Sequence, residues 1–183
     1  MHGVVDQLDR PVYPRTGIYA SVDVISATED DGITQDFTRG VVNFTGVKSF
    51  GENTFAVTLE AGDELSGLND LPLYDVFKLG GPGRLSGLFL EQLTGTRYNL
   101  ATARYYRQYA SLPSQLGSGL YFGFTLETGR INDELNETAA TYDWINSASV
   151  FWGADTILGS AYFGYGFSSI SQSTFYLMIG PNF

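Results

Sequence analysis

The segment Leu120–Gly129 has the sequence LYFGFTLETG, in which apolar side chains alternate with small or polar ones. Successive side chains of a strand point to opposite faces, so this period of two predicts a β-strand with one apolar face. The apolar parity consists of Leu120, Phe122, Phe124 and Leu126, opposed by Tyr121, Gly123, Thr125 and Glu127.

The same alternation recurs along most of the chain. It predicts an all-β fold, an antiparallel meander of eight strands joined in sequence order. The predicted strands are 17–27, 38–48, 54–62, 98–110, 120–129, 147–156, 161–168 and 175–183.

The second face of these strands decides between two kinds of sheet. A water-soluble sheet carries Lys, Glu, Arg and Thr on its outer face. Here that face consists of Gly, Ser, Thr and Tyr, with an isolated acid or Arg. Such side chains suit a packed polar interior, which leaves the apolar face to contact lipid, as in transmembrane β-barrels. A soluble ligand-binding β-barrel is the competing interpretation.

Composition excludes several classes of function. Charged residues are 16% of the 183 residues, and the net charge of -10 argues against binding a phosphate backbone. The chain has no cysteine and one histidine, His2, which removes disulfides, thiolate metal sites and most histidine-based catalysis. We therefore expect no catalytic residue, no metal site and no cofactor.

The sequence contains neither a targeting signal nor a membrane-helix pattern. The first thirty residues lack a basic segment followed by an apolar core, so no secretory signal peptide is predicted. The uncharged stretches 108–126 and 156–183 are interrupted by Gly, Ser, Gln and Pro, so neither predicts a membrane helix. A closed barrel is the other structure that spans a bilayer.

The links between predicted strands alternate in length. The long links 28–37, 63–97 and 130–143 carry nine of the ten net negative charges, whereas 49–53, 111–117 and 157–159 are short. Outer-membrane barrels have long external loops and short periplasmic turns. The alternation therefore predicts that the acidic links lie outside the cell.

Three motifs follow one another along the chain: DQLDRPVYPRTG at 6–17, LGGPGRLSGL at 79–88 and FTLETG at 124–129. Together they resemble the bacterial surface antigen barrels, the superfamily of BamA and TamA. They are most similar to the C-terminal barrels of patatin-like autotransporters of the PlpD type. Ser86 stands where assembly and secretion members have Arg, and Leu88 replaces an aromatic residue, which favours the patatin-linked subgroup.

The resemblance implies that segment 79–88 folds back into the barrel lumen. Glu127 and Glu60 are then candidate lumenal acids. One interpretation is a desolvated pair between Arg84 and Glu127, and the other is that both acids face water. The implied site residues are the lumen-loop motif Gly80, Gly81, Arg84, Ser86 and Gly87, and the strand motif Phe124 and Gly129.

The last predicted strand carries a terminal aromatic residue, Phe183. Such a residue resembles the signal read by the outer-membrane barrel-assembly machinery, although a role in the aromatic girdle is compatible with the same position. The rest of this apolar parity is Phe175, Leu177 and Ile179.

We expect an N-terminal segment, 1–16, leading into a barrel domain, 17–183, with 63–97 as a long inserted loop. An eight-stranded barrel is filled by its own side chains and has no room for that loop. In the family, the matching segments form the C-terminal half of a sixteen-strand barrel. A fragment of a longer protein, an autonomous small barrel and two paired copies are the three forms left open.

These expectations combine into a functional hypothesis. The chain is predicted to be an outer-membrane β-barrel of a Gram-negative bacterium that anchors, and exports, a passenger to the cell surface. In the resembling subgroup the passenger is a patatin-type phospholipase, so any lipase activity would lie outside this chain. Expected partners are outer-membrane lipid, lipopolysaccharide, the barrel-assembly machinery, and a passenger domain or a second copy, with no nucleic acid. The alternatives are a protein-translocation or barrel-assembly pore of the same superfamily, and the soluble ligand-binding β-barrel.

Overall fold

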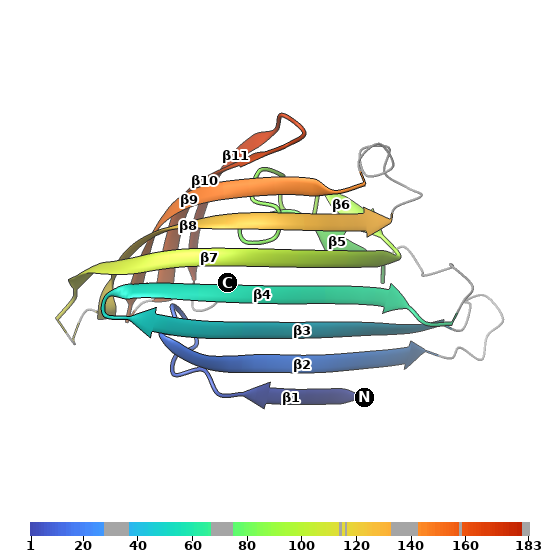
Figure 1. The fold of residues 1–183 in the computed structure, drawn as a ribbon, viewed down its shortest axis with the longest axis horizontal. Coiled ribbons are helices and arrows are strands. Elements are labelled where there is room, and N and C mark those ends of the chain that lie inside the picture. Colours follow the sequence, from blue (N-terminus) through green and yellow to red (C-terminus); the bar gives the residue numbers. More distant parts are fainter. Residues whose placement is uncertain are drawn as a thin grey trace.

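The computed structural model describes residues 1–27, 37–66, 75–113, 115, 117–132, 143–157 and 159–180. Nine strands form one antiparallel sheet in which chain order equals spatial order (Figure 1). No helix in the described part is long and apolar enough to cross a membrane. The sheet strands are β1 (His2–Asp6), β2 (Thr16–Ala27), β3 (Phe37–Phe50), β4 (Asn53–Glu64), β7 (Arg97–Ser111), β8 (Gly117–Asn132), β9 (Ile145–Thr156), β10 (Gly159–Ser168) and β11 (Ser173–Gly180).

All eight predicted strands are present, as β2 to β4 and β7 to β11, and the antiparallel all-β prediction is confirmed. The predicted strand count is wrong, because β1 lies within the N-terminal segment and adds a ninth strand to the sheet. A further two-stranded sheet, β5 (Phe77–Leu79) with β6 (Leu93–Gly95), lies inside the predicted loop 63–97. These three strands are five, three and three residues long, too short to show a periodic pattern.

The two faces of the sheet differ as the alternation predicts. Phe55, Val57 and Leu59 on β4 are about half exposed, and so is Leu126 on β8. The alternate positions on the same strands are buried or partly buried and are occupied by residues such as Thr54 and Thr125. One face of the sheet therefore consists mainly of exposed apolar side chains, whereas the other buries polar side chains together with aromatic and aliphatic ones.

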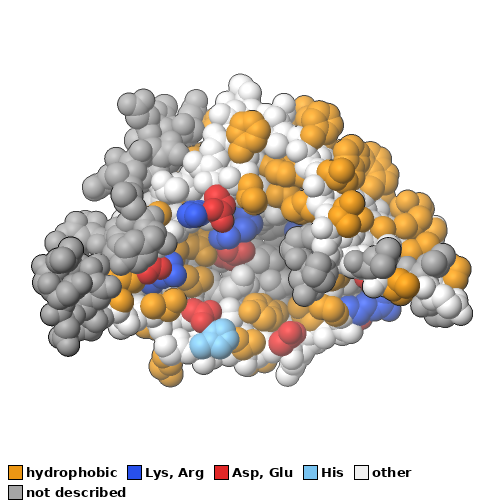
Figure 2. All heavy atoms as spheres, turned by 180° about the vertical axis from the view of Figure 1, so that it is seen from behind, with side chains coloured by type: hydrophobic (Ala, Val, Ile, Leu, Met, Phe, Trp, Pro, Cys, Tyr) orange, Lys and Arg blue, Asp and Glu red, His pale blue; other side chains and the backbone are white. Residues whose placement is uncertain are grey.

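The sheet curves, and the β5–β6 segment lies on its concave side (Figure 1). From that side, acidic and basic side chains gather around a hollow in the middle of the face (Figure 2). Two buried clusters fill the rest. The first packs the inserted segment, residues 75–96 with β5 and β6, against the strand ends that the long links join. The second packs Tyr13 against four aromatic rings of the sheet, Tyr106, Tyr121, Phe151 and Tyr162.

The sheet is open within the described residues. The strand order begins at β1 and ends at β11, and these two strands do not pair with each other. Each end strand therefore has one edge of backbone N–H and C=O groups without a strand partner.

Candidate functional site

The inserted segment is held in a compact turn by its own glycines. Gly80, Gly81 and Gly83 have φ values of 123°, 109° and 73°, a region that side chains with a Cβ rarely adopt. The Gly80 amide donates to the Arg84 carbonyl at 2.9 Å, and the Arg84 amide donates to the Gly81 carbonyl at 3.0 Å. This turn presents the stretch 84–88, with Leu85, Ser86 and Leu88 fully buried, to the concave face.

Glu127 on β8 is the acceptor that fixes the tip of this segment. Its carboxylate accepts from the backbone amide and the Oγ of Ser86, the latter at 2.5 Å. It also accepts from the Thr125 hydroxyl at 2.5 Å, and only 4% of Glu127 is exposed. These three donors satisfy the buried carboxyl group in the place where a cation was expected.

Arg84 pairs with the other candidate acid. Its Nη2 lies 3.0 Å from Glu60 Oε2, and its guanidinium lies 5.6 Å from the centre of the Tyr98 ring. The predicted pair of Arg84 with Glu127 is therefore wrong: Arg84 bonds Glu60, and Glu127 bonds Ser86. The alternative that both acids face water is also wrong, because Glu127 is buried and the Glu60 side chain is 14% exposed. Both carboxylates face inward. Glu127 does not pair with Arg84 because the Ser86 amide and the hydroxyls of Ser86 and Thr125 occupy its oxygens.

The segment continues across the concave face to the last two strands. A Cβ on Gly166 of β10 would lie 1.9 Å from the Ser86 carbonyl oxygen, and one on Gly87 would lie 2.3 Å from the Ser168 amide nitrogen. On β11 the Thr174 hydroxyl donates to the Gly87 carbonyl at 3.2 Å, and the Tyr176 hydroxyl donates to the Leu88 carbonyl. The inserted segment is thus bound to β4, β8, β10 and β11 and braces the curved sheet.

The N-terminal segment fills the other end of the concave face. The Asp9 carboxylate accepts from the amides of Arg15 and Thr16 at 2.7 and 3.0 Å. Partial desolvation opposes ionisation, but these two backbone donors and the charge of Arg10 outweigh it and lower the pKa of Asp9 below 3.8. Asp9 thus links the two ends of the loop 9–16, from which the Tyr13 ring packs against the sheet.

Tyr13 is the residue of that segment that packs most deeply against the sheet. Its ring stacks on Tyr121 with centroids 4.3 Å apart, and Gly153 leaves the space that its hydroxyl end occupies. The Tyr106 hydroxyl donates to the Pro14 carbonyl behind it. Burial raises the pKa of Tyr13 far above its ordinary value, so the phenol is neutral. The segment 7–15 is therefore a second fixed insert.

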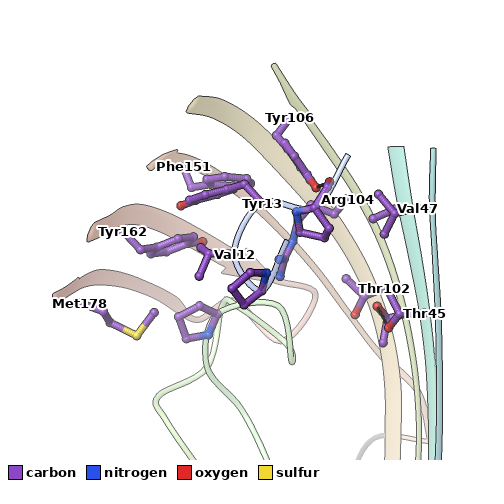
Figure 3. A pocket seen from close by; sticks show the side chains of 15 residues that line it. Val12, Tyr13, Thr45, Val47, Thr102, Arg104, Tyr106, Phe151, Tyr162 and Met178 are labelled. Atoms are coloured by element: carbon purple, nitrogen blue, oxygen red, sulfur yellow. Dashed lines mark hydrogen bonds between the residues drawn. The ribbon is translucent and has the colours of Figure 1, made fainter. Parts of the chain in front are cut away.

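A cavity of about 170 Å³ lies between the two inserts (Figure 3). Arg104 projects into it from β7, and its guanidinium lies 6.0 Å from the centre of the Phe151 ring. The remaining lining includes hydroxyls of β3, β4 and β7 at Thr45, Thr58 and Thr102.

The other predicted site residues have structural positions. Phe124 faces outward and is 42% exposed, whereas a Cβ on Gly129 would lie 3.1 Å from Leu100 and 3.2 Å from Leu85. Phe175, Leu177 and Ile179 are exposed on the edge strand β11. Phe183 lies outside the described residues, and so do the acidic residues of 133–142.

Sequence reasoning missed Tyr13, Thr102, Arg104 and Tyr176 as parts of the site. Thr102 donates to the Gly83 carbonyl at 2.8 Å and sits at the same parity as Arg104. An Arg at an inward position of a strand was the available signal. Among the described residues, no three His, Asp or Glu side chains are grouped to hold a metal ion.

No protein-family model and no curated protein matches the chain. The likeness to the surface antigen barrels therefore rests on the three motifs alone.

Proposed function

We propose that this chain forms the wall of an outer-membrane β-barrel in a Gram-negative bacterium and anchors a passenger at the cell surface. One observation carries the proposal: the convex face is covered by exposed apolar side chains, while Ser, Thr and Glu are buried on the concave face. In water this arrangement would leave a large apolar area exposed, whereas in a bilayer the same area contacts the lipid acyl chains.

Strand length supports the same conclusion. Strands β2 to β4 and β7 to β9 contain 12 to 16 residues, more than the ~9–11 that a tilted strand needs to cross a bilayer. The outward ion pairs Arg97–Asp63 and Arg130–Asp143 lie near the long-link ends of the strands. Charges at that level fit the water-facing boundary of the membrane.

The filled concave face supports an anchor over an open protein-translocation or barrel-assembly pore. Both inserts are bound to the wall by buried side chains, Ser86 with Glu127 and Tyr13 with Tyr121. A static plug of this kind suits a barrel that holds a passenger, as in the patatin-like autotransporters that the motifs resemble. This chain contributes no catalysis in the proposal, because lipid hydrolysis would belong to the passenger.

Closure requires more strands than the described sheet has. Unpaired backbone groups cost several kcal/mol each in hydrocarbon, so the edges of β1 and β11 must be covered. We propose that a second copy, or further strands of a longer protein, completes the barrel. The partners are outer-membrane lipid, lipopolysaccharide and the barrel-assembly machinery, which would read the apolar parity Phe175, Leu177, Ile179 and Phe183.

Membrane extraction tests the proposal. The chain, expressed behind a signal peptide in a Gram-negative host, is expected in the outer-membrane fraction and dissolves only in detergent. The folded form is expected to migrate faster in unheated than in heated samples during denaturing electrophoresis. A protein that is monodisperse in buffer without detergent would instead be a soluble β-barrel and would overturn the proposal.

A further inference from the structure

Arg104 is a cation placed on the inner face of the sheet. It lies on β7 between Thr102 and Tyr106, both buried, and Figure 3 shows its side chain between those two residues with Tyr13 beside it. On β4 its register partner is Ala56, whose small side chain leaves the space in front of the guanidinium open.

Arg104 differs from the other inward arginines. Arg39 and Arg84 each have a buried Nε without a hydrogen bond, but their terminal nitrogens pair with Asp75 at 2.7 Å and Glu60 at 3.0 Å. Arg104 also has a buried Nε without a partner, and no carboxylate or hydrogen-bond acceptor of the described chain binds its guanidinium. Its guanidinium lies 6.0 Å from the centre of the Phe151 ring, an aromatic contact that leaves its N–H donors unused.

No carboxylate is among the described residues that line the cavity, and three acids elsewhere on the inner side have other partners. Asp9 accepts from two backbone amides, and Glu127 accepts from Ser86 and Thr125. Asp155 accepts from the Ser118 hydroxyl at 2.5 Å. The Nε of Arg104 is buried without a hydrogen bond, which is unfavourable, and an anion that accepts from the guanidinium removes that cost.

The cavity offers further donors for an anion. The Thr45 and Thr58 hydroxyls bond each other at 2.9 Å, and in such a pair one hydroxyl proton remains free to donate. The rings of Tyr13 and Tyr162 form part of the opposite wall (Figure 3). A volume of about 170 Å³ exceeds the ~30 Å³ share of a liquid water molecule several times over, which is enough for a tetrahedral oxyanion with ordered water.

We propose that the cavity between the two inserts binds a small oxyanion of the phosphate or sulfate class, with Arg104 as its charge partner. The anion would neutralise the guanidinium and join the N-terminal segment to the inserted segment through one ligand. The proposal goes beyond membrane anchoring and depends only on the geometry of the concave face.

Calorimetric titration of the full chain in detergent micelles with inorganic phosphate, at constant ionic strength balanced by chloride, tests this site. The key variant is Arg104→Gln, and the control is Arg107→Gln, which removes an exposed, outward arginine from the same strand. Wild type and Arg107→Gln are expected to bind phosphate equally, and Arg104→Gln about tenfold or more weakly. Sulfate should compete with phosphate.

Thermal unfolding provides a second measurement that does not depend on detecting heat. Phosphate is expected to raise the Tm of wild type and Arg107→Gln but not of Arg104→Gln. Absence of phosphate binding by wild type, or equal binding by Arg104→Gln, overturns the proposal.

Discussion

Glu127 is a buried carboxylate that contacts no cation in the described structure. Three donors, the amide and hydroxyl of Ser86 and the hydroxyl of Thr125, satisfy it instead. This arrangement ties the position of the inserted segment to the two side-chain oxygens of Glu127. At the residue scale, the brace therefore depends on the acceptor capacity of Glu127.

Replacing Glu127 with Gln is expected to loosen the inserted segment. The amide has one acceptor oxygen and places an NH2 group against the donors, which costs about 1–3 kcal/mol. Limited proteolysis should show faster cleavage between residues 65 and 96, and the urea midpoint should fall. The matched change Glu52→Gln, in an exposed turn, should leave both unchanged. Wild-type cleavage rates in the Glu127→Gln variant would contradict this role.

Asp9 gives a prediction about pH. Its lowered folded-state pKa means that its hydrogen bonds contribute fully above pH 3.8 and are lost as the pH falls through the lower folded value. The amide proton shifts of Arg15 and Thr16, followed by NMR, should therefore titrate with a midpoint below 3.8. The Asp9→Asn variant should abolish that titration. A midpoint at or above 3.8 in the wild type would show that the two amides do not hold Asp9.

At the element scale, β10 and the inserted segment approach each other through glycine. The positions that allow this contact are Gly87 and Gly166, about eighty residues apart in the sequence. No side chain fits between the two backbones, so their separation controls how tightly the segment braces the sheet.

A methyl group at Gly166 should push the inserted segment away from β10. Gly166→Ala is expected to destabilise the chain by about 1–3 kcal/mol, the usual cost of overpacking. Gly46→Ala on β3 is the matched control, because its Cβ would meet only the Phe44 ring at 3.7 Å. The measurement is the urea midpoint of unfolding, which should be lower for Gly166→Ala than for Gly46→Ala. Equal midpoints would rule out close contact at Gly166.

The sequence predicts elements better than it predicts the contacts of this segment. Alternation identifies β8 because Phe124 and Glu127 must face opposite sides whatever the tertiary structure. It does not choose between Glu60 and Glu127 as the partner of Arg84, because that choice depends on the curvature of the sheet and on backbone donors. The packing of Tyr13 on Tyr121 is likewise a contact between distant segments, so it produces no periodic pattern in the sequence that could predict it.

At the scale of the whole molecule, the two free edges determine assembly. In a bilayer, the unpaired backbone groups of β1 and β11 would drive copies of the isolated chain to pair along these edges. The sequence contains no cysteine, so single cysteines introduced at chosen positions report such pairing without background.

Mixed samples of Leu177→Cys, on β11, and a set of single cysteines along β1 are expected to form disulfide-linked dimers in liposomes. Both strands lie at sheet edges, and Leu177 is 71% exposed. Val150→Cys, on the interior strand β9, is the control and should stay unlinked. A monomer with no link from any edge position would show that the chain covers its edges by another route.

The central claim is that the convex face contacts lipid, and fluorescence quenching tests it most directly. Trp144 and Trp152 are both about half exposed, whereas the neighbouring Phe151 is 1% exposed on the other face. In bilayers with brominated acyl chains, the Trp152 fluorescence of a Trp144→Phe variant should be strongly quenched. A Phe151→Trp reporter in a chain whose two native tryptophans are replaced by Phe should be quenched far less. Equal quenching of the two reporters, or none of Trp152, would contradict the account.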